Sequence, residues 1–96
     1  MFRPGRELKQ FFRALTSASR LRIVQQLAGA RGEVSVGELA LRLQMSQPLV
    51  SWHLRDLRRI RLVQMRRTGR LSLCSLDRRQ LAYYQSQFAD LFKEIS

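Results

Sequence analysis

Apolar residues recur along the chain at helical spacing near both ends. Residues 6–15 are expected to form a first helix, with Leu8, Phe11, Phe12 and Leu15 on one side and polar residues on the other. A last helix is expected over residues 78–95. Its apolar positions form one wide stripe, made of Leu81, Tyr84, Phe88, Leu91, Phe92 and Ile95.

A second helix is expected to follow a break at residues 16–19. Ser17 is a suitable N-cap, because its hydroxyl can accept a bond from a free backbone N–H of the first turn. The helix is expected to end near Gly29 and Gly32. Its inner face is expected to consist of Leu21, Val24, Leu27 and Ala28.

A short helix and a longer one are expected in the middle of the chain. Residues 34–36 favour a short strand, and Ser35 with Glu38 then forms the S-x-x-E pattern of a helix start. The inward face of the short helix is expected to consist of Leu39, Ala40 and Leu43. After a turn at residues 44–46, Ser46 is expected to cap a helix over residues 47–59, which faces inward through Val50, Leu54 and Leu57.

Strand-type alternation follows in residues 62–66 and 71–76. Between them stands Arg67-Thr68-Gly69-Arg70, where Gly69 can adopt the positive φ that a tight turn requires. This pattern predicts a β-hairpin with a basic tip. Asp77 and Gln80 then resemble another helix start, in front of the last helix.

The charge of the chain indicates an anionic partner. The 96 residues carry 18 Lys and Arg against 7 Asp and Glu, a net charge of +11, and 16 of the basic residues are Arg. Residues 46–70 alone carry a net +6, whereas residues 71–96 are neutral. Arginine binds phosphate and guanine in a planar, bidentate manner, so nucleic acid is the partner that this composition favours most.

The two middle helices with the turn between them read as a helix-turn-helix, and the hairpin reads as its wing. If the apolar residues of the 47–59 helix face inward, the opposite face presents Pro48, Ser51, Trp52, Arg55 and Arg59. At the wing, Arg66, Arg67 and Arg70 surround the tip and can reach the DNA backbone or a minor groove.

The counts of Cys and His exclude several classes of protein. With one Cys, Cys74, and one His, His53, the chain cannot form an internal disulfide or a four-ligand zinc site. Neither a nucleophile–base pair nor a glycine-rich phosphate loop is visible, so we expect no enzyme, no metal and no cofactor. No apolar run is long enough to span a membrane, and we expect a cytoplasmic protein.

Three segments in order make the chain resemble the ArsR/SmtB family of bacterial transcriptional regulators. They are RALTSASRLRIVQQLA, VSVGELALRLQMSQPLVSWHLRDLRRIRLV and RRTGRLSLCSL, which together lie between about Phe12 and Leu76. The resemblance implies a homodimer that binds an operator in double-stranded DNA, usually as a repressor relieved by an inducer. It also implies that the first and last helices form the dimer interface.

The expected fold is mainly α (α+β): a single winged helix-turn-helix domain over residues 1–96, with about five helices and a two-stranded hairpin wing. The resemblance places the DNA-binding residues on the 47–59 helix and on the wing. Together with the outward face derived above, the expected DNA-binding set is Ser46, Gln47, Pro48, Ser51, Trp52, His53, Arg55, Arg59, Arg66, Arg67 and Arg70. The apolar stripes of the helices at about 6–15 and 78–95 are the expected dimer interface.

Several features depart from the family or leave alternatives open. Residues 34–36 lack the thiols of metal-sensing members, and the last helix has no His or Cys, so metal sensing is not expected and any inducer is unknown. His53 can contact phosphate or seat its helix. Arg61 stands where the family commonly has Gly, and must avoid or tolerate a left-handed conformation. A sequence-blind nucleoid-type DNA binder and a protein-interaction module remain as alternative functions.

Overall fold

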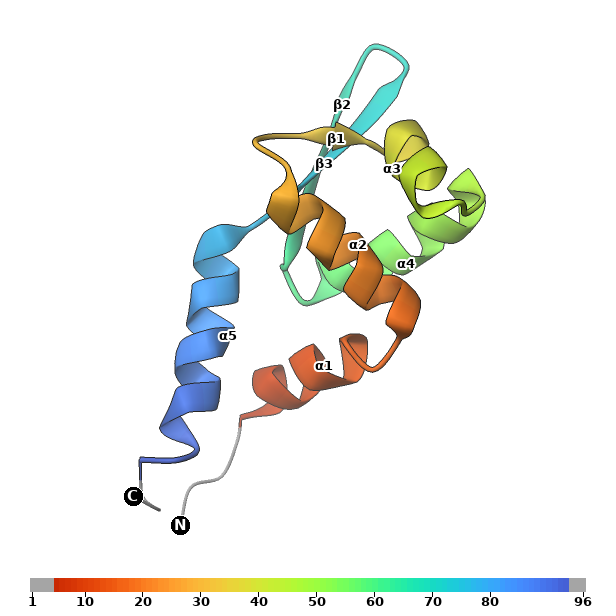
Figure 1. Ribbon diagram of the computed structural model, residues 1–96. Coiled ribbons are helices and arrows are strands. Elements are labelled where there is room, and N and C mark those ends of the chain that lie inside the picture. Colours follow the sequence, from red (N-terminus) through yellow and green to blue (C-terminus); the bar gives the residue numbers. More distant parts are fainter. Residues whose placement is uncertain (1–4, 94–96) are drawn as a thin grey trace.

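The computed structural model describes residues 5–93, and this part of the chain has the expected winged helix-turn-helix fold (Figure 1). The helices are α1 (Arg6–Ala14), α2 (Ala18–Gly29), α3 (Val36–Leu43), α4 (Gln47–Arg59) and α5 (Arg78–Asp90). The strands are β1 (Val34–Ser35), β2 (Val63–Thr68) and β3 (Leu71–Leu76). The fold is mainly α, as the sequence predicts.

The elements are arranged along one long axis. The β2–β3 hairpin projects at one end, α2, α3 and α4 form the body, and α5 lies with α1 at the other end (Figure 1). The principal extents of 49 × 21 × 20 Å reflect this elongated shape. The sheet order is β1-β3-β2, and all pairs are antiparallel. The wing and the two terminal helices are thus at opposite ends of the molecule.

One hydrophobic core joins the helices of the body to the base of the hairpin. Its fully buried side chains include Ile23 and Leu27 of α2, Leu39 of α3, and Leu62 and Cys74 at the sheet. Helix α4 contributes Val50, Leu54 and Leu57, all with no exposed surface, as its spacing predicts. Burial of a side chain of this size stabilises the fold by about 1.5–3 kcal/mol relative to exposure. The orientation of α4 is therefore set by its apolar face.

The helix starts expected from the sequence are confirmed. The side chains of Ser17, Ser35, Ser46 and Asp77 each accept a hydrogen bond from the backbone N–H three residues later, at 3.0–3.3 Å. Such a cap satisfies one of the free N–H groups of the first turn, and its loss typically costs about 1 kcal/mol. Four of the five helices therefore begin where a local side chain stabilises them.

Two helices end at a non-glycine residue in the left-handed conformation. Arg61 has φ 63°, and Leu62 N–H donates to the carbonyl of Leu57. Gln44 has φ 55°, and Met45 N–H donates to the carbonyl of Ala40. In each case the N–H donates to the carbonyl five residues earlier, which satisfies a free carbonyl at the end of the helix. The left-handed residue in this motif is usually glycine. Arg61 therefore tolerates the conformation that its position demands.

The expected inner face of α2 is partly wrong. Leu21 and Ala28 are exposed, and Val24 is only half-buried, whereas Ile23 is fully buried beside Leu27. Ile23 and Leu27 are four residues apart, so they form one helical ridge, and the tertiary contacts of α2 select that ridge over its neighbour. The spacing of apolar residues in the sequence is compatible with burial of either ridge.

The strands and the last helix also differ from their expected bounds. The short strand expected at residues 34–36 is confirmed as β1, which ends at Ser35 and pairs with β3 through Val34 and Cys74 as a third strand of the sheet. Strand β2 continues to Thr68, so the turn consists of Gly69 and Arg70, with Gly69 at φ +59°. Helix α5 ends at Asp90 and not at residue 95, and residues 91–93 form a turn.

Candidate nucleic-acid interface

The helix-turn-helix consists of α3, a short turn and α4. The turn reverses the chain through the left-handed Gln44, and Ser46 then caps α4 at its first turn. Pro48 stands in that first turn, where its missing N–H breaks no helical hydrogen bond. Because Leu39 and Leu43 pack in the same core as Val50, α3 holds α4 in a defined orientation.

The outward face of α4 is polar, basic and aromatic. Its exposed residues are Gln47, Pro48, Leu49, Ser51, Trp52, Arg55, Arg58 and Arg59. Trp52 keeps 51% of its surface exposed, which is costly for a side chain of its size unless a partner covers it. Arg55 and Arg58 form no ion pair with any residue in the described range 5–93. This face therefore offers free guanidinium groups and hydrogen-bonding side chains.

The wing is less basic than its sequence indicates. Arg66 forms a bidentate pair with the Glu33 carboxylate, with N–O distances of 2.7–2.9 Å, and this contact raises the pKa of Arg66 and lowers that of Glu33. Arg66 was expected to bind DNA, but its charge is balanced locally. Arg67 and Arg70 remain exposed, without an ion pair in the described part of the chain.

A hollow of about 360 Å³ separates the wing from the start of α4. Gln47 and Ser51 line it from α4, Arg70 from the turn of the hairpin, and Gly37 from α3. A Cβ on Gly37 would lie 3.3 Å from Nε2 of Gln47, so glycine leaves room for that amide. The helix face and the wing tip thus converge on one concave surface.

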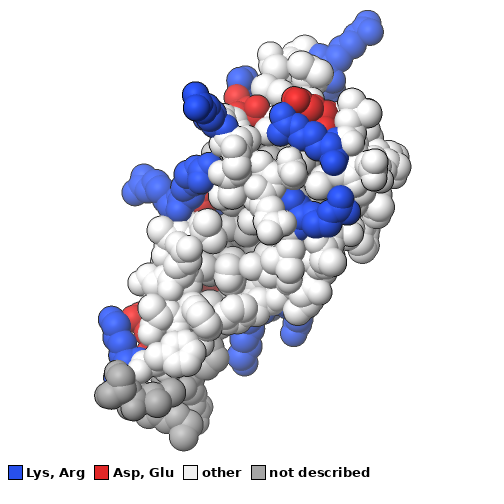
Figure 2. All heavy atoms as spheres, viewed as in Figure 1, with Lys and Arg blue, Asp and Glu red and all other residues white. Residues whose placement is uncertain are grey.

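The space-filling view shows how charge is distributed on one face. Basic side chains project beyond the surface at the end that carries the wing, and the acidic groups are fewer and lie close to basic ones (Figure 2). Proteins use such projecting arginines to neutralise phosphates.

His53 does not belong to this surface. It is only 8% exposed, and no hydrogen-bond partner of its Nδ1 lies in the described part of the chain. Burial disfavours the charged imidazolium and lowers the pKa of His53; nearby Arg20 lowers it further, while Asp56 acts in the opposite direction. Of the two roles expected for His53, seating α4 in the core fits the structure, and contact with phosphate does not.

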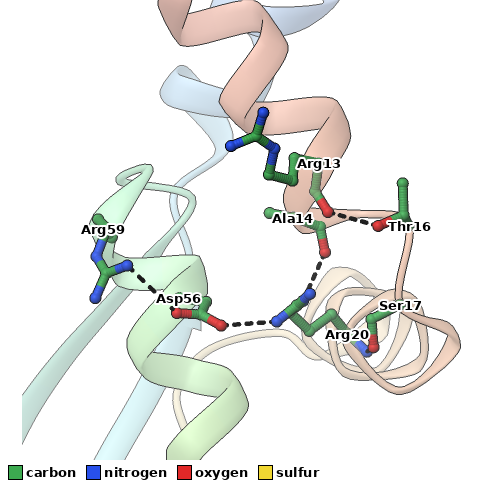
Figure 3. A network of polar contacts seen from close by, with 7 residues as sticks. All are labelled: Arg13, Ala14, Thr16, Ser17, Arg20, Asp56 and Arg59. Atoms are coloured by element: carbon green, nitrogen blue, oxygen red, sulfur yellow. Dashed lines mark hydrogen bonds and ion pairs between the residues drawn. The ribbon is translucent and has the colours of Figure 1, made fainter.

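A polar network ties α4 to the first two helices (Figure 3). Arg20 of α2 donates from Nη1 to Oδ2 of Asp56 at 2.7 Å and from Nε to the carbonyl of Ala14 at 2.7 Å. Arg59, expected among the DNA contacts, has its Nη1 3.7 Å from Oδ1 of Asp56. The one acid of the 46–70 segment is thus engaged inside the fold. Sequence reasoning missed this role of Arg20, which no local pattern marks.

The expected dimer residues divide into an inner and an outer set. Leu8, Phe11 and Tyr84 are buried within the chain itself, where Phe11 stacks on Tyr84 at 4.4 Å and the Tyr84 hydroxyl donates to the carbonyl of Ile60. Leu15, Leu81 and Leu91 are half-buried against the same core. Ile95 lies outside the described residues.

An exposed aromatic row remains on the outside of α1, α5 and the turn that follows α5. Phe12, Phe88 and Phe92 are 40–52% exposed. Phe88 meets both other rings edge-on, at centroid distances of 5.4 Å. We call Phe12, Phe88 and Phe92 the aromatic row. The three rings are in contact through Phe88, and α1 and α5 lie at the end of the molecule opposite the wing (Figure 1).

Cys74 is an inert thiol in this fold. It is fully buried, donates to the carbonyl of Val34 at 3.1 Å, and burial raises the pKa of its thiol to about 11. Within residues 5–93, no three side chains of His, Cys, Asp or Glu gather to hold a metal ion. None of the described helices has the length and apolarity needed to cross a bilayer.

Comparison with known proteins gives consistent matches. Residues 17–65 match the model of the arsR family of bacterial regulatory proteins. A transcriptional repressor SmtB homolog from Synechocystis sp. is 38% identical over 90 residues, which cover 94% of this chain and 67% of that protein. These matches are to transcriptional regulators and not to enzymes.

Solved structures share the fold. An ArsR-like transcriptional regulator from Rhodococcus sp. RHA1 aligns with a TM-score of 0.80 at 27% identity, over 92% of this chain and 81% of that one. A homodimeric winged helix-turn-helix DNA-binding domain from Mycobacterium bovis aligns with a TM-score of 0.71 at 24% identity, over 91% and 81% of the two chains.

The Arg20–Asp56 pair predicts a loss of stability when it is broken. We expect Asp56→Asn to lower the free energy of unfolding by about 1–3 kcal/mol, because Arg20 is left largely buried without its counter-charge. Glu38→Gln breaks the exposed ion pair between Glu38 and Arg42, and it should change the free energy of unfolding by no more than about 0.5 kcal/mol. Urea unfolding of both variants measures the difference. Equal effects would contradict a structural role for the pair.

The buried His53 predicts a pH dependence. Its folded-state pKa is lowered, so below the ordinary value of 6.5 the unfolded chain binds the proton more readily and stability falls as pH falls. In His53→Gln this contribution disappears. The stability difference between the wild type and the variant should shrink between pH 7.5 and 5.5, by up to about 1.4 kcal/mol per pH unit. A difference that stays constant in urea titrations over this range would refute the assignment.

Proposed function

The chain belongs to the ArsR family of bacterial regulatory proteins, and on that premise we propose that it is a dimeric, sequence-specific DNA-binding repressor of transcription. The observation that carries the proposal is the concave surface formed by α4 and the wing, on which Gln47, Ser51 and Arg70 converge. Members of the family are regulators with a winged helix-turn-helix, and this surface is the part of the fold that fits a DNA groove.

Helix α4 is proposed to enter the major groove. Its exposed face offers the amide of Gln47, the hydroxyl of Ser51 and the guanidinium of Arg55, each of which can bond base edges or phosphates. Ser46 caps the start of the helix, and the remaining free N–H groups of its first turn are proposed to bind a phosphate of the DNA. Trp52 would lose its exposed apolar surface against the DNA.

The wing is proposed to contact the neighbouring backbone or minor groove. Arg67 and Arg70 carry this role, since Arg66 is paired with Glu33. Neutralised phosphates release counterions, so binding should weaken steeply as salt is raised. Arg59 is a weaker candidate contact than expected, because Asp56 lies close to its guanidinium group.

A homodimer is proposed through the aromatic row of α1 and α5. Each chain carries +11, so two copies can approach closely only through a surface of low charge. Residues 71–96 are neutral overall, and the row itself is apolar. The Mycobacterium bovis domain of the same fold is described as homodimeric. A two-fold axis here would set two copies of α4 in successive major grooves, about 34 Å apart.

The proposal includes no metal sensing through the sites that the family is known to use. Val34 and Val36 stand at the positions of the family's thiol pair, and both are buried apolar residues. The described part of α5 contains no His or Cys. We propose a cytoplasmic regulator whose inducer is of another chemical class.

Two arginine variants test the DNA surface. We expect Arg55→Ala to weaken binding to the DNA upstream of the protein's own gene by about 1–3 kcal/mol and to change the sequence preference. Arg70→Ala should weaken binding to all duplexes by the same factor and reduce the slope of log K against log salt concentration by about one unit. Fluorescence anisotropy at several salt concentrations measures both, with Arg79→Ala on α5 as the matched control.

Other outcomes favour the alternative functions. Equal affinity of the wild type for the upstream DNA and for a scrambled duplex would indicate a sequence-blind, nucleoid-type binder. Binding that does not respond to salt would contradict both arginine roles. Tighter binding to an acidic protein than to any duplex would indicate a protein-interaction module.

A charged substitution tests the dimer surface. We expect Phe88→Asp to yield a folded monomer, because two carboxylates would be brought together in an apolar interface. Leu41→Asp is the matched control, since Leu41 is a more exposed apolar residue on α3, away from the aromatic row. Sedimentation velocity measures the mass and circular dichroism the fold. A Phe88→Asp dimer as stable as the wild type would exclude this interface.

A further inference from the structure

A second hollow, separate from the DNA-binding surface, lies between α1 and the C-terminal half of α4. Its volume is about 240 Å³. Its charged lining consists of Arg13 of α1, Arg20 of α2, and Asp56 and Arg59 of α4. Three guanidinium groups thus face one carboxylate, and the lining carries a net charge of about +2.

The single carboxylate does not satisfy all three cations. Asp56 accepts from Nη1 of Arg20 at 2.7 Å, and the Ala14 carbonyl accepts from Nε of Arg20, so Arg20 already has a counter-charge within the fold. The 3.7 Å from Arg59 to Asp56 is too long for a direct hydrogen bond. Arg13 contributes only its backbone carbonyl, which accepts from the Thr16 hydroxyl. No residue in the described part of the chain partners its guanidinium group.

The two under-used guanidinium groups flank the same space. Figure 3 shows Arg13 reaching from α1 and Arg59 standing on α4, with the Asp56–Arg20 pair between the two helices. Each guanidinium group can bind a carboxylate or phosphate through two parallel N–H donors. Two such groups on separate helices, with a surplus of two positive charges, match a small molecule with two anionic ends. The volume lies just below the range of ordinary ligand sites, which excludes bulky ligands.

We propose that this hollow binds a small anion with two or more carboxylate or phosphate groups, bridged between Arg13 and Arg59. Since Arg13 follows Phe12 of the aromatic row and Arg59 belongs to α4, the bound anion would couple the dimer surface to the DNA-binding helix. By linkage, anion and DNA then alter each other's affinity by the same factor. This second step rests on the proposed function, whereas the binding site itself does not.

The direction of the coupling follows from charge. A bound anion neutralises Arg59 at the end of α4 and Arg13 at the end of α1, and it holds Arg59 away from solvent, so DNA binding becomes weaker. The hollow would then serve as an inducer site made of arginines and not of metal ligands.

The binding step is tested on the full chain without DNA. Citrate, succinate and inorganic pyrophosphate are titrated by isothermal calorimetry at constant ionic strength, which keeps general screening equal. We expect saturable binding of at least one of them, one per chain, weakened about tenfold or more in Arg13→Gln. Arg13→Gln should keep the fold, since the Arg13 guanidinium has no hydrogen bond or ion pair within residues 5–93; circular dichroism checks this. The matched control, Arg79→Gln, removes one exposed arginine elsewhere and should leave binding unchanged.

Three outcomes would overturn the site. No saturable binding of any of the three anions excludes it. Equal weakening in Arg13→Gln and Arg79→Gln would show general attraction to a cationic surface. Binding to the Phe88→Asp variant but not to the wild type would show that a second copy of the chain fills the hollow.

The coupling is tested separately, by anisotropy of the upstream DNA with the anion that binds. We expect the anion to weaken DNA binding in the wild type and in Arg79→Gln, and to have little effect in Arg13→Gln. An unchanged DNA affinity at saturating anion overturns the coupling but leaves the site. A wild type that binds no duplex overturns the proposed function, and the calorimetric result still stands.

Discussion

The burial of one side of α4 is the constraint on which the rest of the structure depends. Val50, Leu54 and Leu57 are removed from water completely, and a helix that buries one face must present the opposite one. Gln47 and Ser51 face outward because the opposite side of the helix is buried. The proposed DNA-binding surface is in this sense a consequence of the core, and a substitution inside the core would misplace it.

The charge of the chain serves two separate purposes. Arg20 and Arg66 are each paired with a carboxylate from a distant segment of the chain, Arg20 in a part-buried site and Arg66 at the surface. Arg55 and Arg67 are left free at the surface, where they can meet phosphate. The net charge of +11 measures the attraction for an anion, but only the pairing pattern tells which arginines remain available for it.

The two terminal helices show a similar division between internal and external roles. The stacked pair of Phe11 and Tyr84 attaches α5 to the domain, and the aromatic row beside it stays exposed. An apolar stripe that is wider than the contact with one neighbouring helix can pack both against its own domain and against a partner. The width of this stripe is visible in the sequence. Which half serves which role depends on how α1 crosses α5.

The sequence by itself determined the features that depend on neighbouring residues. Caps at Ser17 and Ser46, the inward face of α4 and the positive φ of Gly69 were all predictable, because the interacting groups lie within four residues of one another. The tertiary structure alone decided the rest. Arg20 meets Asp56 across 36 residues and Arg66 meets Glu33 across 33, and the burial of His53 depends on packing around α4. No spacing rule marks such pairs, because the partners are far apart in the sequence and only the tertiary fold brings their segments together.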